Sequence, residues 1–108
     1  HVAQINDLTG EETEALSEIF KNTIVRFDNL FNISFPNITM HQNGPCDGKE
    51  ESKLFHYHIE FYPPMRDPDK LKYLAGFESG GGNIINPVKP EQAAGQMRDN
   101  DLVHYSQK

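Results

Sequence analysis

Apolar residues recur every three or four positions between residues 16 and 31, a spacing that predicts an amphipathic helix. Thr9 and Glu12 precede this run with the spacing of a capping box, in which each side chain hydrogen-bonds the backbone amide of the other residue. We therefore expect a long helix that begins after Thr9 and buries one stripe of side chains. The stripe consists of Leu16, Ile19, Phe20, Thr23, Ile24, Phe27, Leu30 and Phe31.

The segment from residue 53 to residue 62 alternates between polar and apolar side chains and predicts a central β-strand. Pro63 and Pro64 cannot donate hydrogen bonds to a sheet, so the strand would stop there. Successive side chains of a strand point to opposite faces, which gives this strand one polar and one apolar face. The polar face would carry His56, His58, Glu60 and Tyr62, and the apolar face Phe55, Tyr57, Ile59 and Phe61.

Weaker patterns predict the remaining elements. Residues 37–41 read as a short strand, residues 65–70 as an exposed loop, and residues 71–78 as a second strand-like segment. Pro90 suits the first position of a shorter helix that would run to Arg98. Residues 102–105 could add an edge strand.

Together these elements predict a single α+β domain that occupies residues 1–108. One long and one short helix would pack on one face of a mainly antiparallel sheet. A chain of this length has room for one such core.

Charge and cysteine content narrow the function classes. The 10 basic and 16 acidic residues give a formal net charge of -6, which argues against nucleic acid as a partner. No apolar run is long enough for a membrane span. Cys46 has no second cysteine with which to form an internal disulfide, so we expect a reducing, cytoplasmic setting.

Alternate positions of the predicted central strand carry imidazole and carboxylate groups, which are good ligands for zinc or iron. His58 and Glu60 would lie on one face, and His41, at the end of the preceding strand, is the best third candidate. The residues alone leave two other interpretations open. The histidines could be hydrogen-bonded residues of a half-buried face, or His58 could be a nucleophile that accepts a phosphoryl or nucleotidyl group.

Motifs spread along the chain resemble, in order, the C-terminal half of the galactose-1-phosphate uridylyltransferase family, within the histidine-triad superfamily. This resemblance implies a histidine-triad-like fold. The motifs are Phe27-Asp28-Asn29-Leu30-Phe31, Ser34-Phe35-Pro36, Met40-His41, His58-Ile59-Glu60-Phe61-Tyr62-Pro63-Pro64, Lys72-Tyr73-Leu74-Ala75-Gly76-Phe77-Glu78, Pro90-Glu91-Gln92-Ala93-Ala94 and Val103-His104-Tyr105.

The resemblance implies an enzyme that exchanges a uridylyl group between UDP-glucose and galactose 1-phosphate through a covalent uridylyl-histidine. In this family the nucleophile lies in a His-Pro-His segment of the N-terminal half, and this sequence contains no such segment. We therefore expect a fragment, or the product of a truncated gene, with no catalytic residue and no activity alone. Its partners would be the N-terminal half, a second copy in a homodimer, and UDP-glucose or UDP-galactose with a hexose 1-phosphate.

The resemblance also implies two kinds of site. A structural zinc or iron ion would be held by His41, His58 and Glu60, with a fourth ligand, a glutamate, from the N-terminal half; the Glu60 position is a histidine in some family members. The segment that begins at residue 72 would reach across a dimer to the UDP-hexose of the other subunit. The residues expected to contact it are Lys72, Tyr73, Ala75, Phe77 and Glu78.

Two alternatives belong to other function classes. The first is a free-standing histidine-triad nucleotide hydrolase or transferase, in which His58 attacks phosphorus and Glu60 stands where the superfamily pattern has a third histidine. The second is a non-catalytic dimerisation module that a metal ion stabilises. A covalent nucleotide adduct on His58 would favour the first alternative, and metal analysis of a His58→Ala variant bears on the second.

Overall fold

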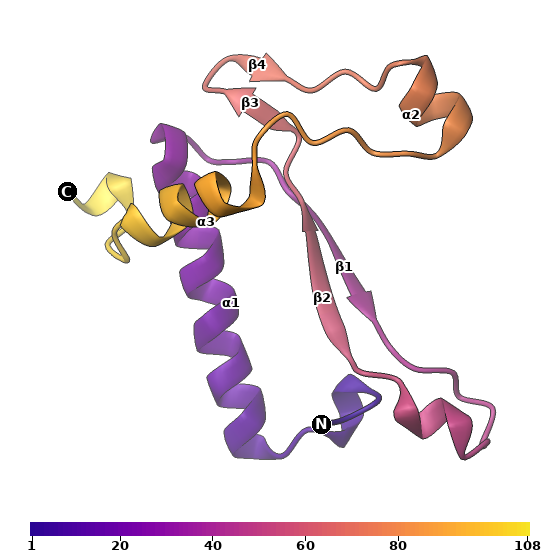
Figure 1. Cartoon of the computed structure of the whole chain (residues 1–108). Helices are drawn as coiled ribbons and strands as arrows, with labels where there is room; N and C mark the ends of the chain where they lie inside the picture. Colours follow the sequence, from indigo (N-terminus) through magenta and orange to yellow (C-terminus); the bar gives the residue numbers. More distant parts are fainter. The chain divides into compact units, whose positions relative to one another are not determined.

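The computed structural model describes all residues from 1 to 108, and the chain divides into two compact units. The first unit comprises residues 1–21 and 37–63, and the second comprises residues 22–36 and 64–108. Helix α1 (Gly10–Phe31) contributes its first half to one unit and its second half to the other (Figure 1). None of the helices is long and apolar enough to cross a membrane.

The start of α1 confirms the predicted capping box. The amide nitrogen of Thr9 donates to Oε2 of Glu12 at 2.8 Å, and the amide of Glu12 donates to Oγ1 of Thr9 at 3.2 Å. The Thr9 amide also holds the pKa of Glu12 below its usual value, because this hydrogen bond favours the ionised carboxylate. The first turn of α1 is thus fixed by two local side chains.

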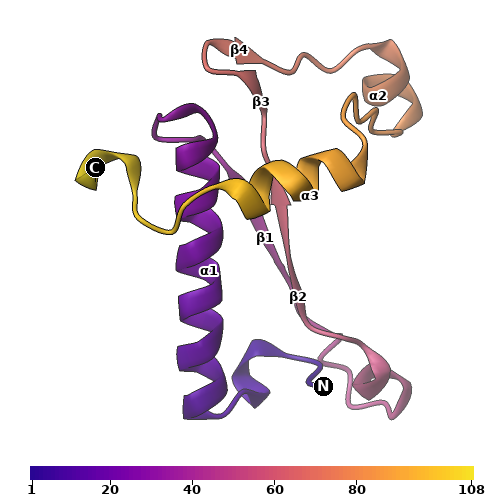
Figure 2. The same ribbon diagram turned by 60° about the vertical axis from the view of Figure 1, so that its left-hand side comes forward.

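Strands β1 (Ile38–Gln42) and β2 (His58–Tyr62) form a two-stranded antiparallel sheet in the first unit (Figure 2). The predicted strand from residue 53 was too long. Residues 51–54 form a 3-10 helix, and the amide of Tyr57 donates to the carbonyl of Val2 at 2.9 Å instead of to a neighbouring strand. The N-terminal segment therefore takes the hydrogen bonds that a longer ladder would have needed.

The β1–β2 sheet has two chemically different faces. Thr39, His41, Ile59 and Phe61 lie on the face toward α1, where the ring of Phe20 lies 5.6 Å from that of Phe61 and 6.3 Å from that of His41. Since paired residues share a face, the antiparallel register puts the others on the opposite face. These are Ile38, Met40, Gln42, His58, Glu60 and Tyr62.

In the second unit, β3 (Met65–Asp67) and β4 (Lys70–Leu71) form a hairpin, so the loop predicted for residues 65–70 was wrong. Pro68 and Asp69 connect the two strands, and both residue types favour turns. The strand-like prediction for residues 71–78 was wrong as well. Only its first residue is in β4, and α2 (Gly76–Gly81) replaces its end.

Helix α3 (Pro90–Asp99) confirms the predicted shorter helix with proline at its start. It is tied to α1 within the second unit, because Arg26 donates to the carbonyl of Met97 and Asn100 donates to the carbonyl of Arg26 at 2.9 Å. The edge strand predicted for residues 102–105 was wrong. Residues 105–107 form a 3-10 helix whose amide at Tyr105 donates to the side chain of Asn29 at 2.7 Å.

The α+β class is confirmed, with antiparallel strand pairing throughout. The strands form two separate two-stranded sheets instead of one larger sheet. The first half of α1 covers one face of β1–β2, while α3 contacts the second half of α1.

Candidate functional site

Four polar side chains lie together on the face of the β1–β2 sheet that is turned away from α1. His58, Glu60 and Tyr62 come from alternate positions of β2, and Gln42 lies opposite His58 on β1. The Nε2 atom of His58 is 3.3 Å from Oε1 of Glu60, and both side chains remain partly exposed, at 49% and 37%. The predicted convergence of His58 and Glu60 on one face is therefore present.

The contact made by Nδ1 of His58 indicates which ring nitrogen carries the proton. Nδ1 lies 2.8 Å from the carbonyl oxygen of His56, which can only accept a hydrogen bond, so Nδ1 carries the proton. In the neutral ring Nε2 then presents a lone pair to the carboxylate oxygen of Glu60. These two electron-rich atoms attract each other only if a positive charge accompanies them, which is either a second proton or a metal ion.

The Glu60 carboxylate is held by its other oxygen. The Tyr62 hydroxyl donates to Oε2 at 2.5 Å, and the Gln42 amide donates to the same oxygen at 3.4 Å. The hydrogen bond from the Tyr62 hydroxyl lowers the pKa of Glu60 most, and the hydrogen bond from the Gln42 amide lowers it further. Glu60 is therefore ionised at neutral pH and able to bind a cation.

The spacing of the two donor atoms fits a metal ion. Two ligand atoms at zinc–nitrogen and zinc–oxygen bond lengths in a tetrahedral site lie about 3.4 Å apart, and Nε2 of His58 and Oε1 of Glu60 are 3.3 Å apart. The hydrogen bond from Nδ1 to a backbone carbonyl is the support that metal-bound imidazoles usually have. The pair fits zinc or iron as two ligands of a larger set, and no cluster of three His, Cys, Asp or Glu residues is present.

His41, the third predicted ligand, is not brought to this pair. It pairs with Ile59, so its side chain lies on the α1 face of the sheet, where Nδ1 is 2.7 Å from the Tyr57 hydroxyl. The residue of β1 that faces His58 is Gln42, one position later. The position of Gln42 beside His58 was missed because the strand was predicted to end at residue 41. A shift of one residue along a strand moves a side chain to the other face of the sheet.

His56, which the alternation placed beside His58, lies outside β2. Its ring lies 4.7 Å from the ring of His1, and its carbonyl accepts the Nδ1 proton of His58. It acts on the site through its backbone, as a support of His58.

Lys72 and Glu78, two of the five predicted substrate contacts, hold each other. Their side chains are 14% and 4% exposed, and the Lys72 ammonium bonds both the Glu78 carboxylate and the carbonyl of Ile85. The Ile85 amide donates to Oε2 of Glu78 at 3.2 Å. The Lys72 ammonium holds the pKa of Glu78 below its usual value, so the Glu78 carboxylate is ionised at neutral pH.

The other three predicted substrate contacts lie between Lys72 and Glu78 in the sequence, and their side chains are exposed. Tyr73 is 84% exposed and Phe77 is 62% exposed, and Ala75 lies at the start of α2 with its side chain also exposed. Leu74 and Ile84 are exposed as well, at 60% and 66%. Of the five predicted contacts, Lys72 and Glu78 therefore form a largely buried ion pair. Tyr73, Ala75 and Phe77 lie on an exposed, mainly apolar surface.

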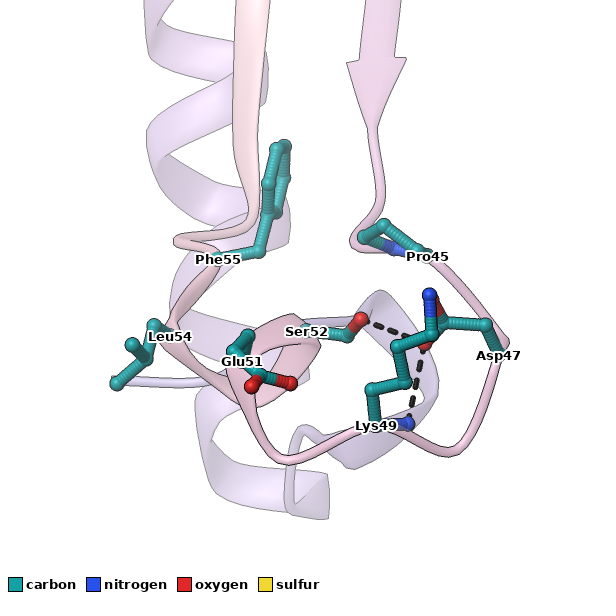
Figure 3. Close-up of a pocket in the computed structure, with 7 residues that line it drawn as sticks. All are labelled: Pro45, Asp47, Lys49, Glu51, Ser52, Leu54 and Phe55. Carbon is teal, nitrogen blue, oxygen red and sulfur yellow. Dashed lines mark hydrogen bonds and ion pairs between the residues drawn. The ribbon is translucent and has the colours of Figure 1, made fainter.

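The loop between β1 and β2 forms an open hollow, and none of the predicted site residues belongs to its wall. Its polar side chains bond each other: Asp47 accepts hydrogen bonds from the Ser52 hydroxyl at 2.5 Å and from the Lys49 amide at 3.1 Å (Figure 3). These contacts brace the loop. Its walls are Pro45, Asp47, Lys49, Glu51, Ser52, Leu54 and Phe55.

Comparison with known proteins decides the family. The family model described as galactose-1-phosphate uridyl transferase, C-terminal domain, matches residues 1–108. The chain belongs to this family. Galactose-1-phosphate uridylyltransferase of Thermotoga maritima is 38% identical over 102 residues, which are 94% of this chain and 32% of that protein. The enzyme of the same name from Haemophilus influenzae is 33% identical over 109 residues, covering 100% of this chain and 31% of its own length.

A third relative has the same name. Galactose-1-phosphate uridylyltransferase of Rattus norvegicus is 32% identical over 108 residues, covering 97% of this chain and 28% of that protein. The galactose-1-phosphate uridyl transferase C-terminal domain thus spans about a third of the length of these curated relatives.

Proposed function

We propose that this chain is the C-terminal part of an enzyme that transfers a uridylyl group between UDP-glucose and galactose 1-phosphate. The observation that carries the proposal is the match of the family model to the whole chain. The sequence contains no His-Pro-His segment, so the nucleophile would come from another part of the enzyme. We further propose a cytoplasmic setting, which the free cysteine, Cys46, is compatible with.

The first contribution of this domain would be half of a structural zinc or iron site. His58 and Glu60 would supply two ligands, and the remainder would come from outside the pair. Bound there, the metal ion would stabilise the fold by joining separate segments of the enzyme. His41 is a ligand by resemblance alone, because in the structure its side chain lies on the opposite face of the sheet.

The second contribution would be the exposed segment from Tyr73 to Phe77, which would contact the UDP-hexose bound to the other subunit of a homodimer. Aromatic side chains supply large contact areas at low cost in conformational entropy, and both aromatic residues are exposed. The ion pair of Lys72 and Glu78 would hold the segment in shape. A direct contact of that pair with the substrate stays a prediction.

Uridylyl exchange measured with radiolabelled UDP-glucose tests the proposed function. We expect no turnover with the 108-residue chain alone and turnover with the full-length protein, because the nucleophile lies outside this domain. In the full-length protein, Phe77→Ala should raise the KM for UDP-glucose about tenfold with little change in kcat, since it removes contact area that ground state and transition state share. Ile19→Ala is the matched control, because Ile19 is 64% exposed and lies in α1, outside this segment. Turnover by the chain alone would contradict the proposal.

Metal content separates the two histidines. In the full-length protein we expect His58→Ala to lose nearly all bound zinc or iron, because it removes a direct ligand. His41→Ala should keep the metal, since this side chain faces α1 and bonds Tyr57. Elemental analysis of the purified proteins measures both. Retention of metal by His58→Ala, or its loss from His41→Ala, would refute the arrangement proposed here.

The nucleotide hydrolase alternative is tested on the same residue. If His58 were a nucleophile, incubation with a nucleotide sugar would leave a covalent adduct on it, which mass spectrometry detects. We expect none, because Nε2 of His58 already has a partner in the Glu60 carboxylate, 3.3 Å away.

A further inference from the structure

We propose that the face of the β1–β2 sheet turned away from α1 is the surface on which the preceding part of the same enzyme docks. The inference rests on the proposed function, because the occupant belongs to the longer enzyme and lies outside the 108 residues of this chain. Three apolar side chains lie on this face, and all are exposed: Ile38 at 61%, Met40 at 46% and Tyr62 at 43%. Apolar side chains gathered on one exposed face mark a contact surface for another protein segment.

The order of residues in β1 also indicates a covered outer face. A strand whose outer face meets water carries polar residues at the outward positions. β1 does the opposite: Ile38 and Met40 lie on the face away from α1, while Thr39 and His41 lie on the face toward it. This alternation favours a second protein layer over solvent on the outer face.

The polar side chains on the same face can be covered because they already bond each other. The Tyr62 hydroxyl donates to Oε2 of Glu60 at 2.5 Å, and the Gln42 amide donates to the same oxygen at 3.4 Å. Nε2 of His58 lies 3.3 Å from Oε1 of Glu60. A buried polar group is costly when it has no hydrogen-bond partner. A docked segment would cover these groups without leaving them unpaired.

The sheet gains little burial from this chain alone. β1 pairs only with β2, and although α1 covers one face, no residue of either strand is buried. Two-stranded sheets are marginally stable in water, and each strand here keeps one edge of unpaired backbone groups. A further layer of protein on the outer face would supply the burial that the sheet lacks.

The length of related proteins and the path of the first residues indicate the occupant. The matched region is 32% of the Thermotoga maritima relative, and the family model describes a C-terminal domain, so the greater part of such an enzyme precedes it. The amide of Gly44 donates to the carbonyl of Ala3 at 2.7 Å, and that of Tyr57 donates to the carbonyl of Val2 at 2.9 Å. Residues before His1 in the longer enzyme would therefore enter beside the ends of β1 and β2.

Photo-cross-linking of the full-length protein tests the proposal. A benzophenone amino acid in place of Met40 keeps an apolar side chain on the face and, on irradiation, bonds to C–H groups that lie against it. We expect cross-links to peptides that precede His1, in a product with the mass of one polypeptide. The matched control carries the benzophenone in place of Ile19, which is 64% exposed and lies in α1, and should give no cross-link to those peptides.

Two other cross-linking results would overturn the proposal. A product with the mass of two polypeptides would place a second copy of the chain on the face. Cross-links only within residues 1–108, or none at all, would show that the preceding part of the enzyme does not cover it.

A charge placed on the face gives a second readout. In the full-length protein, Ile38→Glu should lower the thermal unfolding midpoint by about 5 °C or more, because the carboxylate would be buried without a partner. Ile19→Glu, on a side chain of nearly equal exposure, should shift the midpoint by no more than about 2 °C. Equal shifts in the two variants would contradict a docked layer over β1.

The cross-linking result does not depend on enzyme activity. Cross-links from position 40 in a full-length protein that shows no uridylyl exchange would confirm the docking surface and overturn the proposed function. Uridylyl exchange without such cross-links would support the proposed function and overturn the docking surface.

Discussion

Phe35→Ala should lower the free energy of unfolding of the chain by about 3–5 kcal/mol, the usual cost of removing a buried aromatic ring. Phe35 is 6% exposed and is one of only three buried apolar residues. Its ring lies 5.5 Å from that of Phe27 and 5.7 Å from that of Phe31, so it closes an aromatic cluster against the last turns of α1. The alanine variant leaves a cavity that this small core has few side chains to fill.

Urea unfolding of the 108-residue chain, followed by circular dichroism, measures the loss. Phe77→Ala is the control, because a ring that is 62% exposed should contribute no more than about 0.5 kcal/mol. A domain of this kind has roughly 5–15 kcal/mol in total, so Phe35→Ala would remove a large part of it. Equal effects of the two substitutions would show that the aromatic cluster is not the core of its unit.

Asn29→Ala should cost about 2–4 kcal/mol, although asparagine is a polar residue, because its side chain is 8% exposed and makes three hydrogen bonds. Its amide nitrogen donates to the carbonyls of Asp101 and Val103 at 2.8 and 2.9 Å, and its carbonyl accepts from the amide of Tyr105 at 2.7 Å. Alanine would leave those three backbone groups without partners.

The expected result is a lower unfolding midpoint, by roughly 10 °C or more for a chain of this size, together with faster hydrogen exchange at the amide of Tyr105. Asn22→Ala, in the same helix, is the control: none of the side-chain hydrogen bonds above involves Asn22, and alanine is the better helix former. Fast exchange confined to the tail, without a change in midpoint, would mean that residues 100–108 open independently of the rest.

Elements that depend on local signals could be predicted from the sequence. The capping box between Thr9 and Glu12 set the start of α1, and alternation from His58 to Tyr62 identified β2 and the meeting of His58 with Glu60. Pro90 marked the start of α3. In each case the side chains that decide the structure are neighbours in sequence.

Elements that depend on contacts between residues far apart in the sequence could not be predicted. The C-terminal tail follows the hydrogen bonds of Asn29, more than seventy residues earlier, instead of its own apolar pattern. The segment after β4 bends because Lys72 and Glu78 pair and both bond Ile85. The register of β1 with β2, which puts Gln42 instead of His41 beside His58 and Glu60, is likewise set by strand pairing and not by composition.

Because of this register, the order of residues 41 and 42 decides which of the two side chains lies opposite His58. Exchanging the residues at positions 41 and 42, by His41→Gln together with Gln42→His, would leave mass, net charge and composition untouched. It would nevertheless move an imidazole ring from one face of the sheet to the other. The ring would leave the side of Phe20 and lie opposite His58, because successive side chains of a strand point to opposite faces. Two proteins with identical amino-acid content would thus differ in how many imidazole rings lie on the face of the sheet that carries His58.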